Sequence, residues 1–220
     1  MAVGLLISLW STVLQAQNEF QPEWDFGINA GVTSSSVSFV PRVAQGNLQQ
    51  LQVGATVRYL SEKNFGLQGE LNLSQRGWKE EKDDIPTHKF SKQLLYAEMP
   101  VMTHIYFNLG KRVRLIFNMG PQISYLVSEK VKESDIVPKI DFENTENYPI
   151  QYNTPTQTKF DWGIIGGGGL ELRTGIGSFV VEGRYFYGLA DIYKNSKKDY
   201  YAQSSNQVLG VKLTYFYNRK

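Results

Sequence analysis

The chain has 220 residues, of which 23 are Lys or Arg, 21 are Asp or Glu and none is Cys. The formal charge of +2 is too even for a nucleic-acid-binding surface, and the lack of cysteine excludes disulfides, thiolate metal sites and a lipid-anchoring cysteine. Aromatic residues make up 13% of the chain and glycine numbers 20, a mixture that favours strands, so the composition predicts one all-β domain.

Residues 1–16, MAVGLLISLWSTVLQA, are uncharged and mainly apolar, and they are too short to span a bilayer comfortably. Ala16 before Gln17 supplies the small residue of a signal-peptidase site, so we predict a signal peptide at 1–16 and a barrel domain at 17–220. A buried N-terminal strand or helix is the alternative. Because no Lys or Arg precedes the apolar stretch, we expect the true translation start to lie upstream.

Stretches of alternating apolar and polar residues follow, each the length of a strand. They lie near residues 24–32, 49–59, 65–78, 93–107, 113–127, 160–173, 177–188 and 207–217. Short turns at 60–64, 108–112 and 174–176 alternate with long loops at 33–48, 79–92, 128–159 and 189–206. This asymmetry predicts an eight-stranded antiparallel up-and-down transmembrane β-barrel of the bacterial outer membrane, with periplasmic short turns and a monomer surrounded by lipid.

The strand period of two assigns the side chains to two faces. In the last strand Leu209, Val211 and Leu213 share one face, while Lys212 and Thr214 share the other. Aromatic residues end the apolar faces at two levels, which predicts two girdles at the membrane interfaces. They are Tyr59, Phe65, Phe107, Phe179 and Tyr217 near the short turns, and Trp78, Tyr125, Trp162 and Tyr187 near the long loops. The alternative is a soluble, lipocalin-like barrel that holds a small ligand against an inner apolar face.

Several of these stretches together resemble a known family of outer-membrane proteins. The segments WDFGINAGVTSS, LLYAEMPVMTHIYF, NMGPQISYLVS, DWGIIGGGGLEL, VVEGRYFYGLADIY and VLGVKLTYFY resemble, in their order and spacing, the PorT-like outer-membrane β-barrel family of Bacteroidetes. The resemblance implies an eight-stranded outer-membrane barrel and little chemistry; some members are tied to type IX secretion. It also implies the barrel-assembly machinery as a partner during biogenesis, although Tyr217 is followed by Asn218, Arg219 and Lys220 rather than ending the chain.

The polar faces carry full charges, which would be very costly to bury unpaired. Strand parity sends inward Glu70, Glu98, Glu171, Glu182, Arg58, Arg76, Arg114, Arg173 and Arg184. Because about eight strands enclose just enough room for side chains, we predict an internal carboxylate–guanidinium network that plugs the lumen and serves structure. A narrow ion or proton channel is the functional alternative.

Glycines and prolines inside strands need separate explanations. The run Gly166–Gly169 lacks the helix and Lys of a phosphate loop, and we expect Gly167 and Gly169 to make room for Arg184 and Glu182 on the next strand. Pro100 and Pro121 fall within strands, where each removes a ladder hydrogen bond. Counting about the intervening turn places Pro100 near Gly120 and Pro121, so a bulge or local break is expected there.

The sequence offers little support for catalysis or metal binding. Of two histidines, His104 points inward by parity, and His88 lies in a loop near Asp83 and Asp84, too loosely constrained for a preorganised metal site. No serine stands beside matching partners, so we expect no enzyme, cofactor or metal.

Binding at the surface is the better functional expectation, because long loops are often functional. Residues 128–159 form the longest predicted loop, with Phe142, Tyr148 and Tyr152 as the candidate contacts of a protein partner. We therefore expect a non-enzymatic outer-membrane barrel that serves envelope structure, surface binding or secretion.

Overall fold

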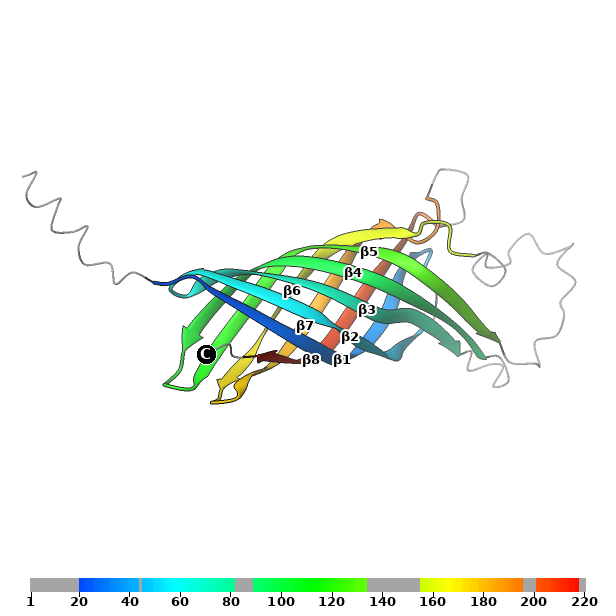
Figure 1. Ribbon diagram of the computed structural model, residues 1–220. Helices are drawn as coiled ribbons and strands as arrows, with labels where there is room; N and C mark the ends of the chain where they lie inside the picture. The colour runs from blue at the N-terminus through cyan, green and yellow to red at the C-terminus, as the bar shows by residue number, and fades with distance from the viewer. Residues whose placement is uncertain (1–19, 44, 82–88, 134–154, 196–200, 218–220) are drawn as a thin grey trace, which may run out of the picture.

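The computed structural model describes residues 20–43, 45–81, 89–133, 155–195 and 201–217, and they form one closed antiparallel barrel (Figure 1). Its strands are β1 (Glu23–Val40), β2 (Gly46–Glu62), β3 (Phe65–Glu81), β4 (Lys89–Asn108), β5 (Val113–Glu133), β6 (Phe160–Arg173), β7 (Gly177–Asp191) and β8 (Gln203–Tyr217). None of the described residues forms a helix long and apolar enough to cross a membrane. The predicted fold is confirmed.

Each strand pairs with its neighbours in chain order, and β1 closes the barrel against β8. This seam runs without interruption from Phe26↔Tyr217 to Val40↔Gln203. The three tight turns lie at one rim, which we call the short-turn end, and the wider connections lie at the other, the long-loop end. Figure 1 shows the strands crossing the barrel at a strong tilt, as closure of a sheet requires.

The strands are longer at the long-loop end than the sequence predicted. The expected loop at 33–48 is wrong, because β1 continues to Val40 and β2 begins at Gly46, leaving only 41–45 as a connection. Residues 33–40 are rich in Ser, yet they keep the period of two and all pair with β8, and the first three also pair with β2. β4 and β5 reach 20 and 21 residues, about twice the 9–11 that a tilted strand needs to span a bilayer.

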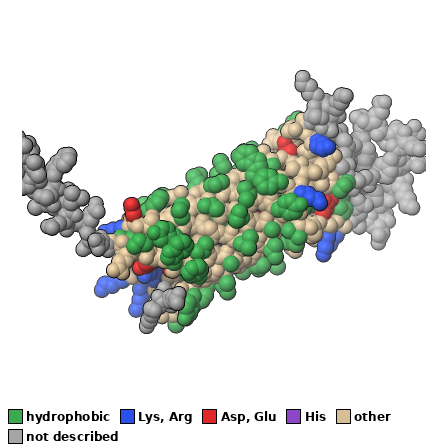
Figure 2. All heavy atoms as spheres, turned by 45° about the horizontal axis from the view of Figure 1, so that its top comes forward, with side chains coloured by type: hydrophobic (Ala, Val, Ile, Leu, Met, Phe, Trp, Pro, Cys, Tyr) green, Lys and Arg blue, Asp and Glu red, His purple; other side chains and the backbone are tan. Residues whose placement is uncertain are grey.

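The outer surface carries the apolar faces of the strands, as predicted. Figure 2 shows hydrophobic side chains over the middle of the barrel and charged side chains toward its two ends. Ile28, Leu71 and Met119 expose more than six-tenths of their surface, although each is a large apolar residue. An apolar belt with charged rims is the outer surface expected of a membrane barrel.

The predicted aromatic girdles are correct except at one position. Tyr125, Trp162 and Tyr187 are exposed near the long-loop end. Trp78 is completely buried instead. It shares the inward parity of Arg76 on β3, so its assignment to the outer girdle was wrong.

The prolines interrupt pairing without shifting it. Pro100 pairs with Gln122, the residue after Pro121, which agrees with the approximate position predicted. The β4–β5 ladder then stops and resumes three residues further along β4 in the same register. The expected local break is therefore present and the alternative bulge is absent, because a proline removes a donor without adding a residue.

A second interruption separates β2 from β3 near the long-loop end. Pairing stops between Asn47↔Trp78 and Gln52↔Ser74, with a shift of register. β1 spans this gap from inside: the Ser35 hydroxyl donates to the Gly77 carbonyl and accepts from the Gly77 amide, both at 2.9 Å. Gly77 itself has φ of 147°, a conformation that favours glycine. Side chains of β1 thus replace part of the missing ladder.

Candidate functional site

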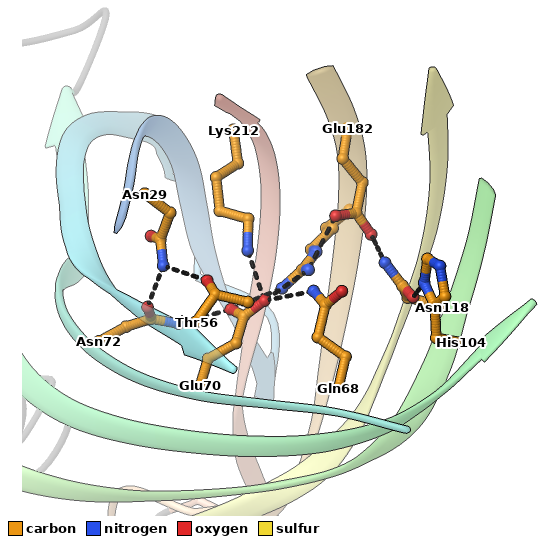
Figure 3. A network of polar contacts seen from close by, with 10 residues as sticks. Asn29, Thr56, Gln68, Glu70, Asn72, His104, Asn118, Glu182 and Lys212 are labelled. Atoms are coloured by element: carbon orange, nitrogen blue, oxygen red, sulfur yellow. Dashed lines mark hydrogen bonds and ion pairs between the residues drawn. The ribbon is translucent and has the colours of Figure 1, made fainter. Parts of the chain in front are cut away.

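Glu70 is the centre of a buried ionic network in the middle of the lumen (Figure 3). Its carboxylate accepts two hydrogen bonds from Arg184, at 2.9 and 2.7 Å, and one from Lys212 at 2.6 Å. The side-chain amides of Gln68 and Asn72 donate to the same carboxylate. Two cations and two amides therefore surround one anion on strands β3, β7 and β8, and a bidentate guanidinium is the strongest arrangement of this kind.

The network continues across the lumen toward β5 and β4. Arg184 also contacts Glu182 at 2.7 Å. Asn118 donates to Glu182 at 2.7 Å and lies 2.7 Å from Nδ1 of His104. Figure 3 shows this chain extending from Glu182 through Asn118 to the imidazole. All four side chains are buried, so the chain ends at His104 inside the barrel.

A second ionic cluster lies nearer the short-turn end. Arg58 donates to both oxygens of Glu171 at 3.0 Å and contacts Asp25 at 2.9 Å. Arg114 lies 3.9 Å from the same Glu171 carboxylate. Arg173 is only partly buried and makes no ion pair among the described residues, so it stays outside the cluster.

A third cluster lies nearer the long-loop end, around Arg76. Its guanidinium contacts Glu98 at 2.6 Å and Asp161 at 2.9 Å. The same guanidinium lies over the rings of Tyr96 and Phe186, at 4.9 and 4.3 Å from their centroids. A cation desolvated in this way gains from the ring faces as well as from the carboxylates.

Apolar side chains close the lumen on both sides of the ionic clusters. The aromatic cap at the long-loop end consists of Val37, Phe39, Trp78, Phe90, Leu94, Tyr96, Leu126, Ile192, Tyr193 and Tyr201. The short-turn cluster consists of Leu60, Tyr106, Ile116, Val180 and Phe216, with Phe20 packed against it. Burial, with the nearby Glu129 carboxylate, raises the pKa of the Tyr193 hydroxyl above its ordinary value. Lys92 on β4 donates to this hydroxyl at 3.0 Å, which connects Tyr193 to the β4 part of the cap.

The lumen is filled rather than open. The interior cavity beside Arg76 and Arg184 measures about 30 Å³, enough for about one water molecule. Buried polar atoms near it without a protein partner include Oε1 of Gln122 and Nε of Arg184. A water molecule bound there would satisfy such atoms, but the space is too small for a substrate.

Strand parity located most of the buried charges, and the structure distributes them over three clusters. Eight of the nine predicted residues belong to these clusters, and Arg173 does not. Sequence reasoning missed Asp25 and Asp161 as partners and treated Lys212 only as a polar-face residue. The same parity that placed Glu171 inward would have found Asp161 on β6. As predicted, Gly167 and Gly169 pair with Arg184 and Glu182.

Other predicted positions lie outside the described residues. These are the signal peptide 1–16, the partner residues Phe142, Tyr148 and Tyr152, and the loop residues Asp83, Asp84 and His88. Within the described part of the chain, no three His, Cys, Asp or Glu side chains cluster as a metal site would require.

The long-loop rim exposes part of β5 beyond the barrel wall. The β5–β6 ladder ends at Tyr125↔Phe160, whereas β5 continues beside β4 as far as Phe90↔Glu133. Lys130 and Val131 are exposed on this extension. Beyond Tyr125, the Leu126 amide donates to the Lys159 carbonyl and the Thr156 amide donates to the Glu129 carboxylate, and within the described ranges no strand pairs with that side of β5.

The sequence of this barrel matches the model of a known protein family. The model of the outer membrane protein beta-barrel domain matches residues 15–194. The chain belongs to this family. Its location is therefore the outer membrane, and a soluble lipocalin-like barrel is excluded. No curated protein matches the chain in sequence.

Solved outer-membrane barrels are similar at low sequence identity. OprG from Pseudomonas aeruginosa is 11% identical, with 89% of this chain and 96% of that chain covered and a TM-score of 0.47. Ail of Yersinia pestis, in complex with the heparin analogue sucrose octasulfate, is 13% identical, with 89% and 99% covered and a TM-score of 0.42. The outer membrane enzyme PagL is 10% identical, with 85% and 97% covered and a TM-score of 0.46.

Proposed function

We propose that this protein is a non-conducting, non-enzymatic barrel that presents its long-loop end to a protein partner at the cell surface. The observation that carries the proposal is the closed lumen: three ionic clusters lie between two apolar clusters. A plugged interior leaves the outer surface and the rim as the places for function. The long loops face outward in this proposal, as the short periplasmic turns of such barrels require.

The long-loop rim is suited to contact with a polypeptide. Strands β4 and β5 extend beyond the last β6 pair, and within the described residues the exposed Lys130 and Val131 have no strand partner on the side away from β4. An exposed strand edge can accept an additional strand from a partner, with main-chain hydrogen bonds supplying affinity. We propose an extended segment of a protein as the partner. A PorT-like role as an accessory of secretion is a narrower form of the same proposal.

Site-specific photocrosslinking in intact cells tests partner binding. A photoreactive residue at Lys130 should form a protein adduct, while the same residue at Lys111, exposed in the 109–112 turn at the opposite rim, should not. Equal adducts from both positions, or none from Lys130, would contradict the proposal. Heat-dependent migration on a denaturing gel establishes that both variants contain the folded barrel.

Planar-bilayer recordings test the closed lumen. The folded protein should insert without stepwise conductance, because every layer of the lumen is filled by packed or ion-paired side chains. Reproducible unitary steps that change with Glu182→Ala would favour the channel alternative.

A further inference from the structure

Arginines gather on the inner wall of the barrel where the lumen opens at the short-turn end. Arg114 on β5 pairs with Glu171 on β6. One step further toward the rim, the Arg173 amide donates to the Arg112 carbonyl at 2.7 Å, so these two residues lie opposite each other. Like charges that are directly opposite on neighbouring strands repel. The register of β5 and β6 therefore brings three guanidinium groups close to one carboxylate.

That carboxylate is already bound by a different arginine. Both oxygens of Glu171 accept hydrogen bonds from Arg58 at 3.0 Å, and Glu171 is completely buried. Arg114 approaches it only to 3.9 Å, and the charge of Arg173 repels the charge of Arg114. Arg112 and Arg173 make no ion pair with any described residue. The arginines at this opening therefore lack compensating negative charge.

The imbalance at this end amounts to two charges among the described residues. Four guanidinium groups of the inner wall face two carboxylates, those of Arg58, Arg112, Arg114 and Arg173 against those of Asp25 and Glu171. The exposed rim adds two charges of each sign, from Lys63, Lys111, Glu23 and Glu62. The central network is balanced by comparison, because Arg184 and Lys212 are paired with Glu70 and Glu182.

Local contacts hold the arginines in position. The Arg114 guanidinium donates to Asn108 at 3.1 Å and lies 4.2 Å from the centroid of the Tyr106 ring. Arg173 directly precedes a turn that Thr174 closes, with its amide and its hydroxyl both donating to the Gly177 carbonyl, at 2.8 and 2.6 Å. Side chains and turns that are already fixed lose less conformational freedom when a ligand binds.

The direction of these side chains indicates a ligand from water and not from lipid. Arg173 has the inward parity of Glu171, whereas Leu172 between them exposes 46% of its surface on the outer face. Arg112 has the parity of Arg114 in the same way, because the alternation of β5 continues into the turn. The guanidinium groups therefore face the opening of the lumen.

We propose that Arg112, Arg114 and Arg173 bind one phosphate dianion at the short-turn opening of the barrel. A phosphate group carries a charge of about −1.5 to −2 near pH 7, which compensates the excess. Its oxygens also match the paired donors of a guanidinium group. The phosphate is either the free ion or the terminal phosphate of a small molecule. This site lies at the opposite rim from the β5 edge, so it does not depend on partner binding there.

Isothermal titration calorimetry of the full folded chain in a non-ionic detergent tests the site. Sodium phosphate added at constant ionic strength should show saturable binding of one phosphate per chain. Arg173→Gln should weaken this affinity about tenfold, because it removes a charge-assisted contact. Lys63→Gln removes an exposed cation from the turn between β2 and β3 at the same end, and as the matched control it should change the affinity less than about twofold. Heat-dependent migration on a denaturing gel establishes that each variant is folded.

Two further ligands identify the source of the phosphate. Glycerol 3-phosphate that binds at least as tightly as inorganic phosphate would show that the site accepts the terminal phosphate of a small molecule, and weaker binding would identify the free ion as the ligand. Dimethyl phosphate carries a single charge and should bind about tenfold more weakly than inorganic phosphate. Equal affinity for all three ligands, or an equal loss with Arg173→Gln and Lys63→Gln, would mean nonspecific attraction by net charge and overturn the proposal. A lack of saturable phosphate binding would overturn it as well.

Discussion

Inward-facing side chains of the same strands fill the middle of the lumen and its long-loop end. Charged groups fill the middle, whereas aromatic rings fill the long-loop end. Below the aromatic cap, β3 contributes Glu70 to the central ionic cluster and Arg76 to the cluster nearer the long-loop end. At the end, the same face of the same strand contributes Trp78 to the aromatic cap. Strand period therefore determines the direction of a side chain but not the polarity of its surroundings. In this barrel the two layers differ in how they should respond to mutation.

The largest effect is expected in the middle layer. Glu70→Gln would leave Arg184 and Lys212 buried against a neutral amide, and breaking a buried pair costs about 3–5 kcal/mol. Urea unfolding of the barrel in lipid vesicles, followed by tryptophan fluorescence, measures this change. Glu23→Gln, at an exposed position of β1, is the control and should change the free energy of unfolding by less than about 0.5 kcal/mol. Equal effects would mean that the network does not stabilise the fold.

A somewhat smaller effect is expected in the aromatic cap. Phe90→Ala removes a buried ring beside Trp78, whose centroid is 6.3 Å away, and should lower the free energy of unfolding by about 3 kcal/mol. The ionic clusters below the cap remain in place, so bilayer recordings should still show no conductance. Conductance in this variant alone would mean that the cap, and not the ionic middle, closes the lumen.

A mutation at the boundary between the two layers should change the free energy of unfolding less. Ser35→Ala removes both hydrogen bonds to the Gly77 backbone, where β2 and β3 do not pair, and should cost about 1–3 kcal/mol. Hydrogen exchange should increase at the Gly77 amide. Ser38→Ala, an outward-facing change on the same strand, is the comparison and should leave that amide protected.

The smallest expected effect is a loss of folding stability at alkaline pH, caused by Tyr193 in the aromatic cap. Because the pKa of Tyr193 is raised in the folded protein, unfolding releases a proton once the pH exceeds the ordinary tyrosine pKa of about 10. Stability should therefore fall as the pH rises above that value, by less than about 1.4 kcal/mol per pH unit. Tyr193→Phe should reduce this slope in urea unfolding measured at successive alkaline pH values. An unchanged slope would show that this hydroxyl does not control it.

The barrel fold and the inward position of most of its charged residues could be predicted from the sequence, because membrane strands alternate apolar and polar residues with a period of two. Glu171 and Arg184 could be placed inward by parity alone, and Gly167 and Gly169 could be paired with the next strand by counting from a turn. The bidentate contact between Arg58 and Glu171 could not be predicted, since it joins strands that are far apart in the chain. Closure and tilt decide which inward residues meet across the lumen.

The errors have physical causes as well. Residues 33–40 resemble a loop because Ser is common in turns, but their continuous pairing with β8 keeps them in β1. Trp78 resembles a girdle residue because tryptophan is frequent at membrane interfaces, but it has the parity of Arg76 and therefore points inward. The gap between β2 and β3 has no clear signal in sequence, since it depends on a register shift opposite Gly77.

The unbroken seam between the first and last strands has a consequence for the order of assembly. Phe26 and Tyr217 come from opposite ends of the described chain, and their ladder continues without interruption to Val40 and Gln203. Contacts between residues so distant in sequence carry the largest entropic cost of loop closure and form slowly. Closure of this seam should therefore be the late, rate-limiting step of folding. Until it closes, β1 and β8 remain open edges on which an assembly factor can act.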